Sequence, residues 1–313
     1  MKRSIFWLLC PLCLWAQEPD LKPDALSPLV VTAQGGFAEP LAESAWSITQ
    51  LKTSNIEAIS RSMPEALSGI PSVMIQKTAL GQSSPYIRGL TGYHNVLLVD
   101  GIRLNHSAMR SGPNQYWSTV ELFGSDQIEV LRGTHGTIYG SDAVGGVVNL
   151  LSSTPHFSAE CDQSIEFLGR LSSAENSWTV GLSGEVSSPY WYAEVSHAER
   201  SFGDLEGGDR VGTQKDTGYD SSGTQFRVAK KMSDDARFTL GFQHAFMEDV
   251  PRTHKTINGL NWEGLSVGKE IWRRLDQERN LYYGKIDWSD IGGWADSGQI
   301  TLSKHRHDQE RNR

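Results

Sequence analysis

The pattern of hydrophobic and polar positions divides the chain into two parts. Between residues 54 and 152, apolar residues occur first at helical spacing and then in short continuous runs. From about residue 161 onward, apolar and polar residues alternate in segments of roughly ten residues. Helical spacing predicts helix, whereas alternation predicts strands with one buried face. We therefore expect a compact α+β domain followed by an antiparallel sheet.

The first part is expected to begin with a helix over residues 54–69, which Pro64 breaks or restarts and Gly69 ends. Asp100-Gly101 is a tight-turn pair and predicts a hairpin between the strands on either side. Residues 105–116 are rich in Ser, Gly, Pro and Asn, which predicts a loop before one or two helical turns over 117–123. Strands are expected over residues 73–75, 86–88, 95–99, 102–104, 127–132 and 145–151.

The second part alternates as transmembrane β-strands do. Trp178, Val180 and Leu182 alternate with small or polar residues, and four later segments repeat the pattern. Such strands place one face on lipid and the other on a polar lumen. We expect about seven of them, with long polar connections over residues 202–222 and 247–276. A soluble β-sandwich is the alternative fold that this alternation of apolar and polar residues allows.

The N-terminus has the features of an export signal over residues 1–16. Lys2 and Arg3 precede an apolar run, and a small residue suited to cleavage follows it. A short buried helix is the alternative. Cys10 and Cys13 leave with a cleaved signal, so the mature chain keeps only Cys161 and forms no internal disulfide.

Residues 17–53 are expected to form a flexible tether, because the stretch begins Pro-rich, charged and aperiodic. Residues 28–33 interrupt it with a β-prone run that has no partner close in sequence. This run is either an edge strand of the following domain or a strand kept free to pair with another protein.

Charge and hydrophobic content exclude two classes of protein. The formal net charge of −8 over 313 residues argues against nucleic-acid binding, which requires a basic face. No run of 18 apolar residues follows the first twenty positions, which argues against a helical membrane protein.

Four spaced blocks carry a family resemblance. They are Ile-Arg-Gly at 87–89, Val-Leu-Leu-Val-Asp-Gly-Ile-Arg-Leu-Asn at 96–105, Ile-Glu-Val-Leu-Arg-Gly at 128–133, and the Gly-rich run at 138–150. In this order they resemble the plug core of TonB-dependent outer-membrane receptors. Thr134 and residues 125–127 depart from the family pattern, within or beside turns. The resemblance implies an α+β plug domain over residues 54–155, followed over 156–313 by the first antiparallel strands of a transmembrane β-barrel.

The resemblance also implies a function. Receptors of this family carry out energised uptake of a scarce ligand across the outer membrane, here of the iron-siderophore, haem or cobalamin type, with no covalent chemistry. A second, fainter likeness to haem or haemoglobin receptors lies in residues 250–256 and 276–279. The implied partners are TonB with its inner-membrane energising complex, a small-molecule or metal-chelate ligand and the outer membrane, but no nucleic acid and no resident cofactor. By the same likeness the tether over residues 17–53 is periplasmic, and its TonB box is Leu29, Val30, Val31, Thr32 and Ala33.

Two sets of site residues follow from the resemblance. Arg88, Glu129 and Arg132 are expected to form a charged network between plug and barrel, the alternative being ordinary surface pairs. Ligand contacts are expected from two outward plug loops, over 79–85 and 105–116, and from a long barrel loop. The candidates are Gln82, Ser83, His106, Arg110, Asn114, Tyr116 and His254.

His106 is the candidate with distinctive chemistry, because an imidazole there can ligate haem iron or contact another metal complex. A solvated loop histidine is the alternative. The nine histidines show no HxxxH or HExxH spacing, so we expect no fixed metal site and no catalytic residues.

Three rival interpretations stay open at this stage. About seven strands cannot close around a plug, since plugged transporters use about 22, so we expect a longer natural chain. The alternative to a longer chain is a plug-bearing interaction protein, or a closed barrel assembled from several copies of the chain. A passive porin needs neither plug blocks nor TonB box, and a secreted hydrolase would have to draw on Asp100, Glu129 and Asp142 as its carboxylates.

Overall fold

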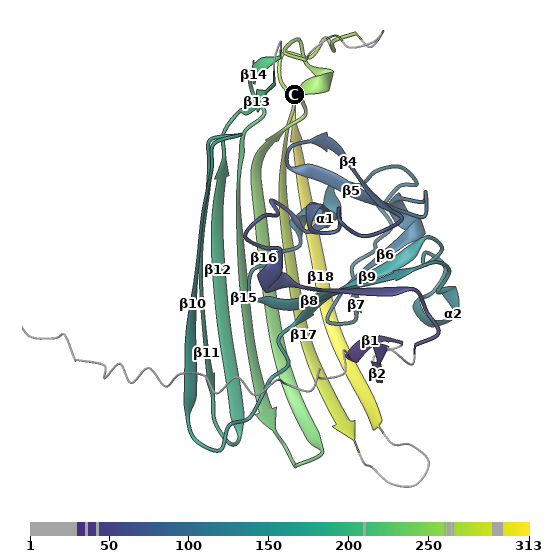
Figure 1. The fold of residues 1–313 in the computed structure, drawn as a ribbon, viewed down its shortest axis with the longest axis vertical. Helices are drawn as coiled ribbons and strands as arrows, with labels where there is room; N and C mark the ends of the chain where they lie inside the picture. The colour runs from purple at the N-terminus through teal and green to yellow at the C-terminus, as the bar shows by residue number, and fades with distance from the viewer. Residues whose placement is uncertain are drawn as a thin grey trace, which may run out of the picture.

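The computed structural model describes residues 30–34, 37–41, 44–208, 211–259, 261, 264, 266–289 and 297–313. Within these ranges, one tall sheet forms a wall and a smaller α+β domain lies against one face of it (Figure 1). The predicted signal segment and Leu29 lie outside the described residues. None of the helices in the described ranges has the length and hydrophobicity that crossing a bilayer requires.

The wall is a seven-stranded antiparallel sheet in which each strand pairs with the next long strand along the chain. The number of strands and their antiparallel order agree with the sequence-based prediction. A two-stranded hairpin, β13 (Leu205–Gly207) with β14 (Gly212–Gln214), projects from the connection between the third and fourth strands. The seven strands are β10 (Asp162–Ser172), β11 (Ser177–Ser187), β12 (Trp191–Phe202), β15 (Tyr219–Lys231), β16 (Ala236–Pro251), β17 (Arg274–Ser289) and β18 (Ser297–Asn312).

The two faces of this wall differ as the alternation predicts. Large apolar side chains such as Ile165, Leu171 and Leu302 are 81%, 87% and 77% exposed on the outer face. Thr179 and Tyr192 point to the other face and are buried. An apolar outer face and a partly polar inner face are what a strand needs between lipid and a lumen. The predicted alternation is confirmed.

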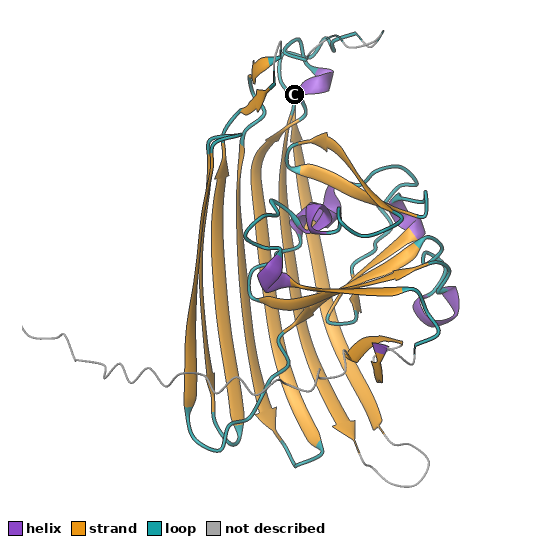
Figure 2. Ribbon diagram, viewed as in Figure 1, coloured by secondary structure: helices purple, strands orange, loops and turns teal. Residues whose placement is uncertain are grey.

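The connections between strands differ in length at the two ends of the wall (Figure 2). Residues 188–190 and 232–235 make short turns at one end. At the other end lie the connection that carries β13 and β14 and the long connection between β16 and β17, which contains η5 (Thr253–Lys255). In barrels of this kind the long loops are extracellular and the short turns periplasmic. We refer to these ends as the outer and inner ends.

The smaller domain is built on a mixed five-stranded sheet. Its order is β3 (Ile48–Lys52), β8 (Ser125–Arg132), β9 (Gly146–Ser152), β6 (Asn95–Val99) and β7 (Ile102–Arg103), and only β6 and β9 are parallel. Asp100 and Gly101 both have positive φ, at 51° and 80°, so the predicted tight turn joins β6 to β7. A separate hairpin is formed by β4 (Val73–Ala79) and β5 (Gln82–Ile87).

The prediction of one helix over residues 54–69 is wrong. This stretch contains only η2 (Thr53–Asn55) and the four-residue helix α1 (Met63–Ala66), with Pro64 in its first turn. Proline has no N–H to donate to a preceding turn, so a helix cannot run unbroken through Pro64, and α1 instead begins one residue before it, at Met63. The tether prediction also extends too far, because β3 is a strand of the domain's sheet. The other helical turns are η3 (Gly92–His94), η4 (Gln115–Thr119) and α2 (Gly136–Tyr139).

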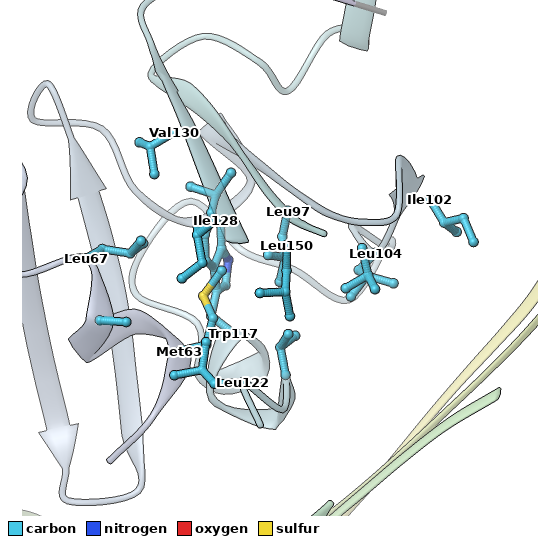
Figure 3. Close-up of a cluster of buried hydrophobic side chains, with 14 of the residues drawn as sticks. Met63, Leu67, Leu97, Ile102, Leu104, Trp117, Leu122, Ile128, Val130 and Leu150 are labelled. Atoms are coloured by element: carbon cyan, nitrogen blue, oxygen red, sulfur yellow. The ribbon is translucent and has the colours of Figure 1, made fainter. Parts of the chain in front are cut away.

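Apolar side chains fill both faces of the five-stranded sheet. In β6, Leu97 and Val99 join the main cluster, while Val96 and Leu98 face a second one. A central strand covered on both faces needs this continuous apolar run. The main cluster gathers Met63, Leu67, Trp117, Ile128 and Leu150 from segments far apart in sequence (Figure 3). Burial of each such side chain contributes about 1.5–3 kcal/mol.

The β-prone run near the N-terminus has a partner. Strand β1 (Val30–Gln34) pairs antiparallel with β2 (Phe37–Pro40), three residues further along. The expectation that this run lacks a partner close in sequence is therefore wrong. Within the described residues these two strands form a sheet of their own, so one edge of β1 takes no further strand. The hairpin of β1 and β2 lies below the five-stranded sheet of the smaller domain, toward the inner end of the wall (Figure 1).

Candidate functional site

The small domain is fastened to the wall by a short segment that follows η4. Glu121 lies in this segment, and Arg200 of β12 points toward it from the wall. Both terminal nitrogens of Arg200 donate to the Glu121 carboxylate, Nη1 to Oε2 and Nη2 to Oε1, each at 2.6 Å. The side chains are only 7% and 11% exposed. A buried bidentate pair fixes both the distance and the orientation between two elements.

The charge on Glu121 is maintained despite its burial. Burial raises the pKa of this carboxyl, but the Arg200 guanidinium and the backbone N–H of Phe123 together bring the pKa below its ordinary value. The N–H of Phe123 donates to Oε1 at 2.8 Å. Glu121 is therefore ionised at neutral pH, and the pair is a charged one.

Phe123 anchors the same segment by shape. Its ring is fully buried in a cluster with Leu168 and Ala198 of the wall. A Cβ placed on Gly181 of β11 would lie 2.9 Å from Phe123 Cε1, so the missing side chain makes room for the ring. Gln225 Nε2 donates to the Phe123 carbonyl at 2.7 Å. Small wall residues thus form a seat for residues 121–123.

A second charged pair lies closer to the outer end. Arg61, which precedes α1, donates from Nε and Nη2 to both carboxylate oxygens of Glu175, at 3.0 and 2.9 Å. Glu175 sits in the turn between β10 and β11 and its side chain is fully buried. The hydrogen bond from Arg61 is the main reason that the pKa of Glu175 falls to about 2.

Two further contacts cross from strand β17. Tyr283 donates from its hydroxyl to Oδ2 of Asp100, at 2.8 Å, in the turn after β6. Arg279 Nε donates to the carbonyl of Thr119 at 3.0 Å. Arg279 is buried, and its Nη1 has no partner within the described residues. These contacts extend the seat across β11, β12, β15 and β17.

The residues predicted for this network occupy other positions. Arg132 Nη1 donates to the carbonyl of Pro71, and Glu129 accepts from Gln127, both contacts lying within the small domain. Arg88 is exposed with φ of 51°, and its Nη1 lies over Gly133. The charged pairs that do join domain and wall use Glu121–Arg200 and Arg61–Glu175 instead. In the sequence, these residues could be recognised only as arginines or acidic residues at inward positions of a strand or turn. Such a position does not predict which residue the side chain pairs with.

Two of the predicted ligand-binding residues lie in a strand and not in the loop where they were expected. Gln82 and Ser83 were expected in an outward loop, but they lie in β5 and are only 2% and 1% exposed. The Ser83 hydroxyl is within hydrogen-bond distance of Ser62 and Ser118. Their loop placement is therefore wrong, because the hairpin with β4 extends to Gln82.

Two more candidates hold the predicted loop over residues 105–116 together. Asn114 is buried, accepts from the Arg110 backbone N–H at 3.2 Å and donates to its carbonyl at 3.0 Å. The Arg110 guanidinium donates to the Pro113 carbonyl at 3.1 Å. Asn114 thus shapes the loop, while the exposed Arg110 side chain remains at its surface.

His106 and Tyr116 come together in this loop, with ring centroids 4.6 Å apart. They face His305 and His307 of β18 across a pocket of about 280 Å³, which Ala108 and Gln309 complete. Burial lowers the pKa of His106, so its imidazole is neutral at physiological pH. His305 and His307 were not singled out from the sequence.

His254 lies apart from this pocket, in η5 at the outer end, and is exposed. Partial burial and the neighbouring Arg252 and Lys255 lower its pKa. Arg252 is itself surrounded by positive charge: burial lowers its pKa, and Arg273, Arg110 and Arg311 lower it further. The outer end above the pocket is therefore rich in arginine.

Residues 40–147 match the family model of the TonB-dependent receptor plug domain. Over 156 residues the chain is 31% identical to the vitamin B12 transporter BtuB of Photobacterium profundum, covering 49% of this chain and 25% of that protein. The FrpB iron transporter of Neisseria meningitidis superposes with a TM-score of 0.68 at 13% identity, over 84% of this chain and 41% of its own. The ferripyoverdine receptor of the outer membrane of Pseudomonas aeruginosa gives 0.64 at 15% identity, over 88% and 36%.

The chain spans less than half the length of each of these proteins. They are named as transporters and receptors, in agreement with the prediction that the chain is not an enzyme. The family match covers the small domain, and the structural likeness extends the same fold through the seven-stranded wall. The chain therefore carries a TonB-dependent receptor plug domain over residues 40–147, seated against antiparallel strands with the fold that solved outer-membrane receptors share.

Proposed function

We propose that this protein takes up a scarce ligand across the outer membrane with energy delivered through TonB. One observation carries the proposal: a plug domain is fastened to the inner face of a barrel wall by the buried pair Glu121–Arg200 and by the half-buried pair Arg61–Glu175. A passive pore needs no such plug. Breaking a buried pair costs several kcal/mol, which is more than thermal motion supplies readily and requires work from outside.

The segment that would receive this work is Leu29 to Ala33. From Val30 onward this segment is described and forms strand β1. One edge of β1 pairs with β2, and its other edge takes no strand within the described residues. An unpaired edge can accept a strand of another protein through main-chain hydrogen bonds. TonB, acting with its inner-membrane energising complex, is the partner that this family uses. The hairpin's position toward the inner end of the wall suits a periplasmic partner (Figure 1).

The ligand would enter from the outer end, where the loop of His106 and Tyr116 meets β18. The relatives compared above are named for vitamin B12, iron and ferripyoverdine. We extend to this chain the class that they share, a metal complex, in the form of an iron-siderophore, haem or cobalamin. Neutral rings beside an arginine-rich outer end suit a complex that carries negative charge.

The test is deletion of residues 29–33 in cells that express the protein, compared with deletion of residues 20–24, five tether residues outside the proposed box. Energised uptake of labelled cobalamin and of ferric siderophores is measured beside binding to de-energised cells. We expect the first deletion to abolish uptake and leave binding intact, and the second to leave both intact. Uptake that persists without residues 29–33 would overturn the proposal in favour of passive passage.

A further inference from the structure

The pocket between plug and wall contains three imidazoles with an unusual common feature. The Nε2 atoms of His106, His305 and His307 are all buried, and none has a hydrogen-bond partner within the described residues. A buried polar nitrogen without a partner costs about 1–3 kcal/mol. Three such atoms around one pocket indicate that the pocket accommodates a ligand whose atoms bind these nitrogens.

The backbone brings these three side chains into one pocket. His305 and His307 are two residues apart on β18, so both point to the same inner face of the wall. His106 reaches the pocket from the plug loop. The ring centroid of His106 lies 6.3 Å from that of His305 and 5.7 Å from that of His307, and the two β18 rings are 6.4 Å apart.

These spacings are close to those of a metal complex. With metal–nitrogen bonds near 2.0–2.1 Å, imidazole rings on one ion have centroids roughly 5 Å apart. The three pairs of rings would therefore have to close by about 0.7 to 1.4 Å on an ion. As the side chains stand, no group of three or more histidine, cysteine or acidic residues in the described ranges could hold a metal ion, so these rings must move before they coordinate one. His106 would also give up the weak hydrogen bond that the Ala108 N–H donates to its Nδ1 at 3.3 Å, since a metal on Nε2 places the proton on Nδ1.

The surroundings decide what form the metal takes. The pocket's lining contains no carboxylate, and neutral imidazoles contribute no negative charge. Buried Arg279 interacts electrostatically with both His305 and His307, and its Nη1 is also without a partner in the described part of the chain. A bare divalent cation would enter a positive field, whereas a negatively charged complex would offset it. The volume of about 280 Å³ also exceeds what a single ion occupies.

We propose that His106, His305 and His307 coordinate a transition-metal ion held in an anionic chelate that leaves coordination positions open. Copper(II) and nickel(II) bind imidazole nitrogen strongly and suit such a site. The assignment rests on the proposed function, because it names the ligand class of the uptake site. It also predicts that the bound complex ties the plug loop directly to β18.

The test is binding of the 1:1 copper(II)–citrate complex to the purified protein in detergent. This chelate is anionic and binds through three donors, which leaves positions for three imidazoles, whereas copper(II)–EDTA fills the coordination sphere with its own donors. All measurements use the Cys161→Ser background, because Cys161 is an exposed free thiol and thiols are copper ligands. Affinity is measured by calorimetry, and coordination by pulsed EPR, which detects the remote nitrogen of a bound imidazole.

We expect the citrate complex to bind with an imidazole signal and the EDTA complex to bind at least about tenfold more weakly. His106→Ala, His305→Ala and His307→Ala should each weaken binding by about tenfold or more, and the matched variant His197→Ala, at an exposed position of β12, should not. Equal binding of both chelates, unchanged affinity in the three variants, or tighter binding of copper(II) alone would each overturn the assignment. None of these results depends on TonB or on residues 29–33, so the uptake proposal stands or falls separately.

Discussion

Glu121 of the plug and Arg200 of strand β12 are joined by two hydrogen bonds of 2.6 Å across the boundary between plug and wall, with both side chains almost completely buried. The residues are far apart in sequence and belong to different structural units. Since the pair is charged and desolvated, each partner depends on the other. Removing one leaves an unpaired charge in a buried site, which costs more than the pair itself contributes.

Arg200→Ala is therefore expected to destabilise the seated plug by about 3–5 kcal/mol. The double variant Glu121→Gln with Arg200→Met removes both charges and should recover most of that loss. Arg306→Ala serves as the control, because Arg306 pairs with Asp308 at an exposed position of β18. Thermal unfolding in detergent micelles, with limited proteolysis of the plug, measures the effect. A loss in Arg200→Ala no larger than in Arg306→Ala would contradict a structural role for the pair.

Gly181→Ala should loosen the seat through shape alone. Its new methyl group would lie 2.9 Å from the Phe123 ring, and overpacking of this kind costs about 1–3 kcal/mol. Gly184→Ala is the matched control on the same strand, where the nearest atom to the new Cβ is 3.9 Å away. Unfolding temperatures of both variants are compared. Addition of Phe123→Leu should restore part of the stability of Gly181→Ala but lower that of the unmodified protein.

Tyr283→Phe should remove one hydrogen bond between wall and plug. The hydroxyl donates to an Asp100 carboxylate that also accepts from the Ser152 N–H at 2.8 Å and its hydroxyl at 2.9 Å. Because these bonds remain, we expect a loss of about 1–2 kcal/mol, at the lower end for a charged acceptor. Tyr282→Phe changes the neighbouring ring, which is 48% exposed on the outer face, and should have no measurable effect on unfolding. Equal losses in the two variants would mean that the Asp100 contact contributes nothing.

The parts of the fold that the sequence predicts are those governed by local periodicity. The seven strands of the wall follow from an alternation with period two, and the turn at Asp100-Gly101 follows from two residues that tolerate positive φ. Strands β13 and β14 do not, because they lie in the stretch predicted as a long polar connection. The break expected at Pro64 occurs, but the helix expected over residues 54–69 is reduced to η2 and the four-residue α1, which apolar spacing alone does not predict.

The candidate site was less predictable, because it depends on partners far apart in the chain. The register of wall strands against the plug places Arg200 on Glu121 and Glu175 on Arg61, and no local pattern encodes that placement. His305 and His307 had a local signal, since residues two apart on a strand share a face. The HxxxH and HExxH spacings considered in the sequence apply to helices, so the strand spacing was overlooked.

The last prediction concerns pH and Glu57, which lies in the turn after η2 near the plug–wall boundary. Burial, with the nearby Glu166 and Glu121, raises its pKa to about 7, although Arg200 opposes the rise. The folded state thus binds a proton more tightly than the unfolded chain, whose carboxyl titrates near 4.5. This contribution to stability is complete below pH 4.5, declines as pH rises toward 7 and is absent above it.

Glu57→Gln cannot ionise and should lose less stability than the unmodified protein between pH 4.5 and pH 7.5. Glu166→Gln removes one of the charges that raise the Glu57 pKa, so its pH dependence should be intermediate. The unfolding temperatures of the three proteins are measured across this range, and differences from the unmodified protein cancel the titration of groups they share, including Glu175 and Glu121. Parallel curves for all three would show that Glu57 titrates in the folded plug as it does in the unfolded chain, and that its burial against the wall is incomplete in solution.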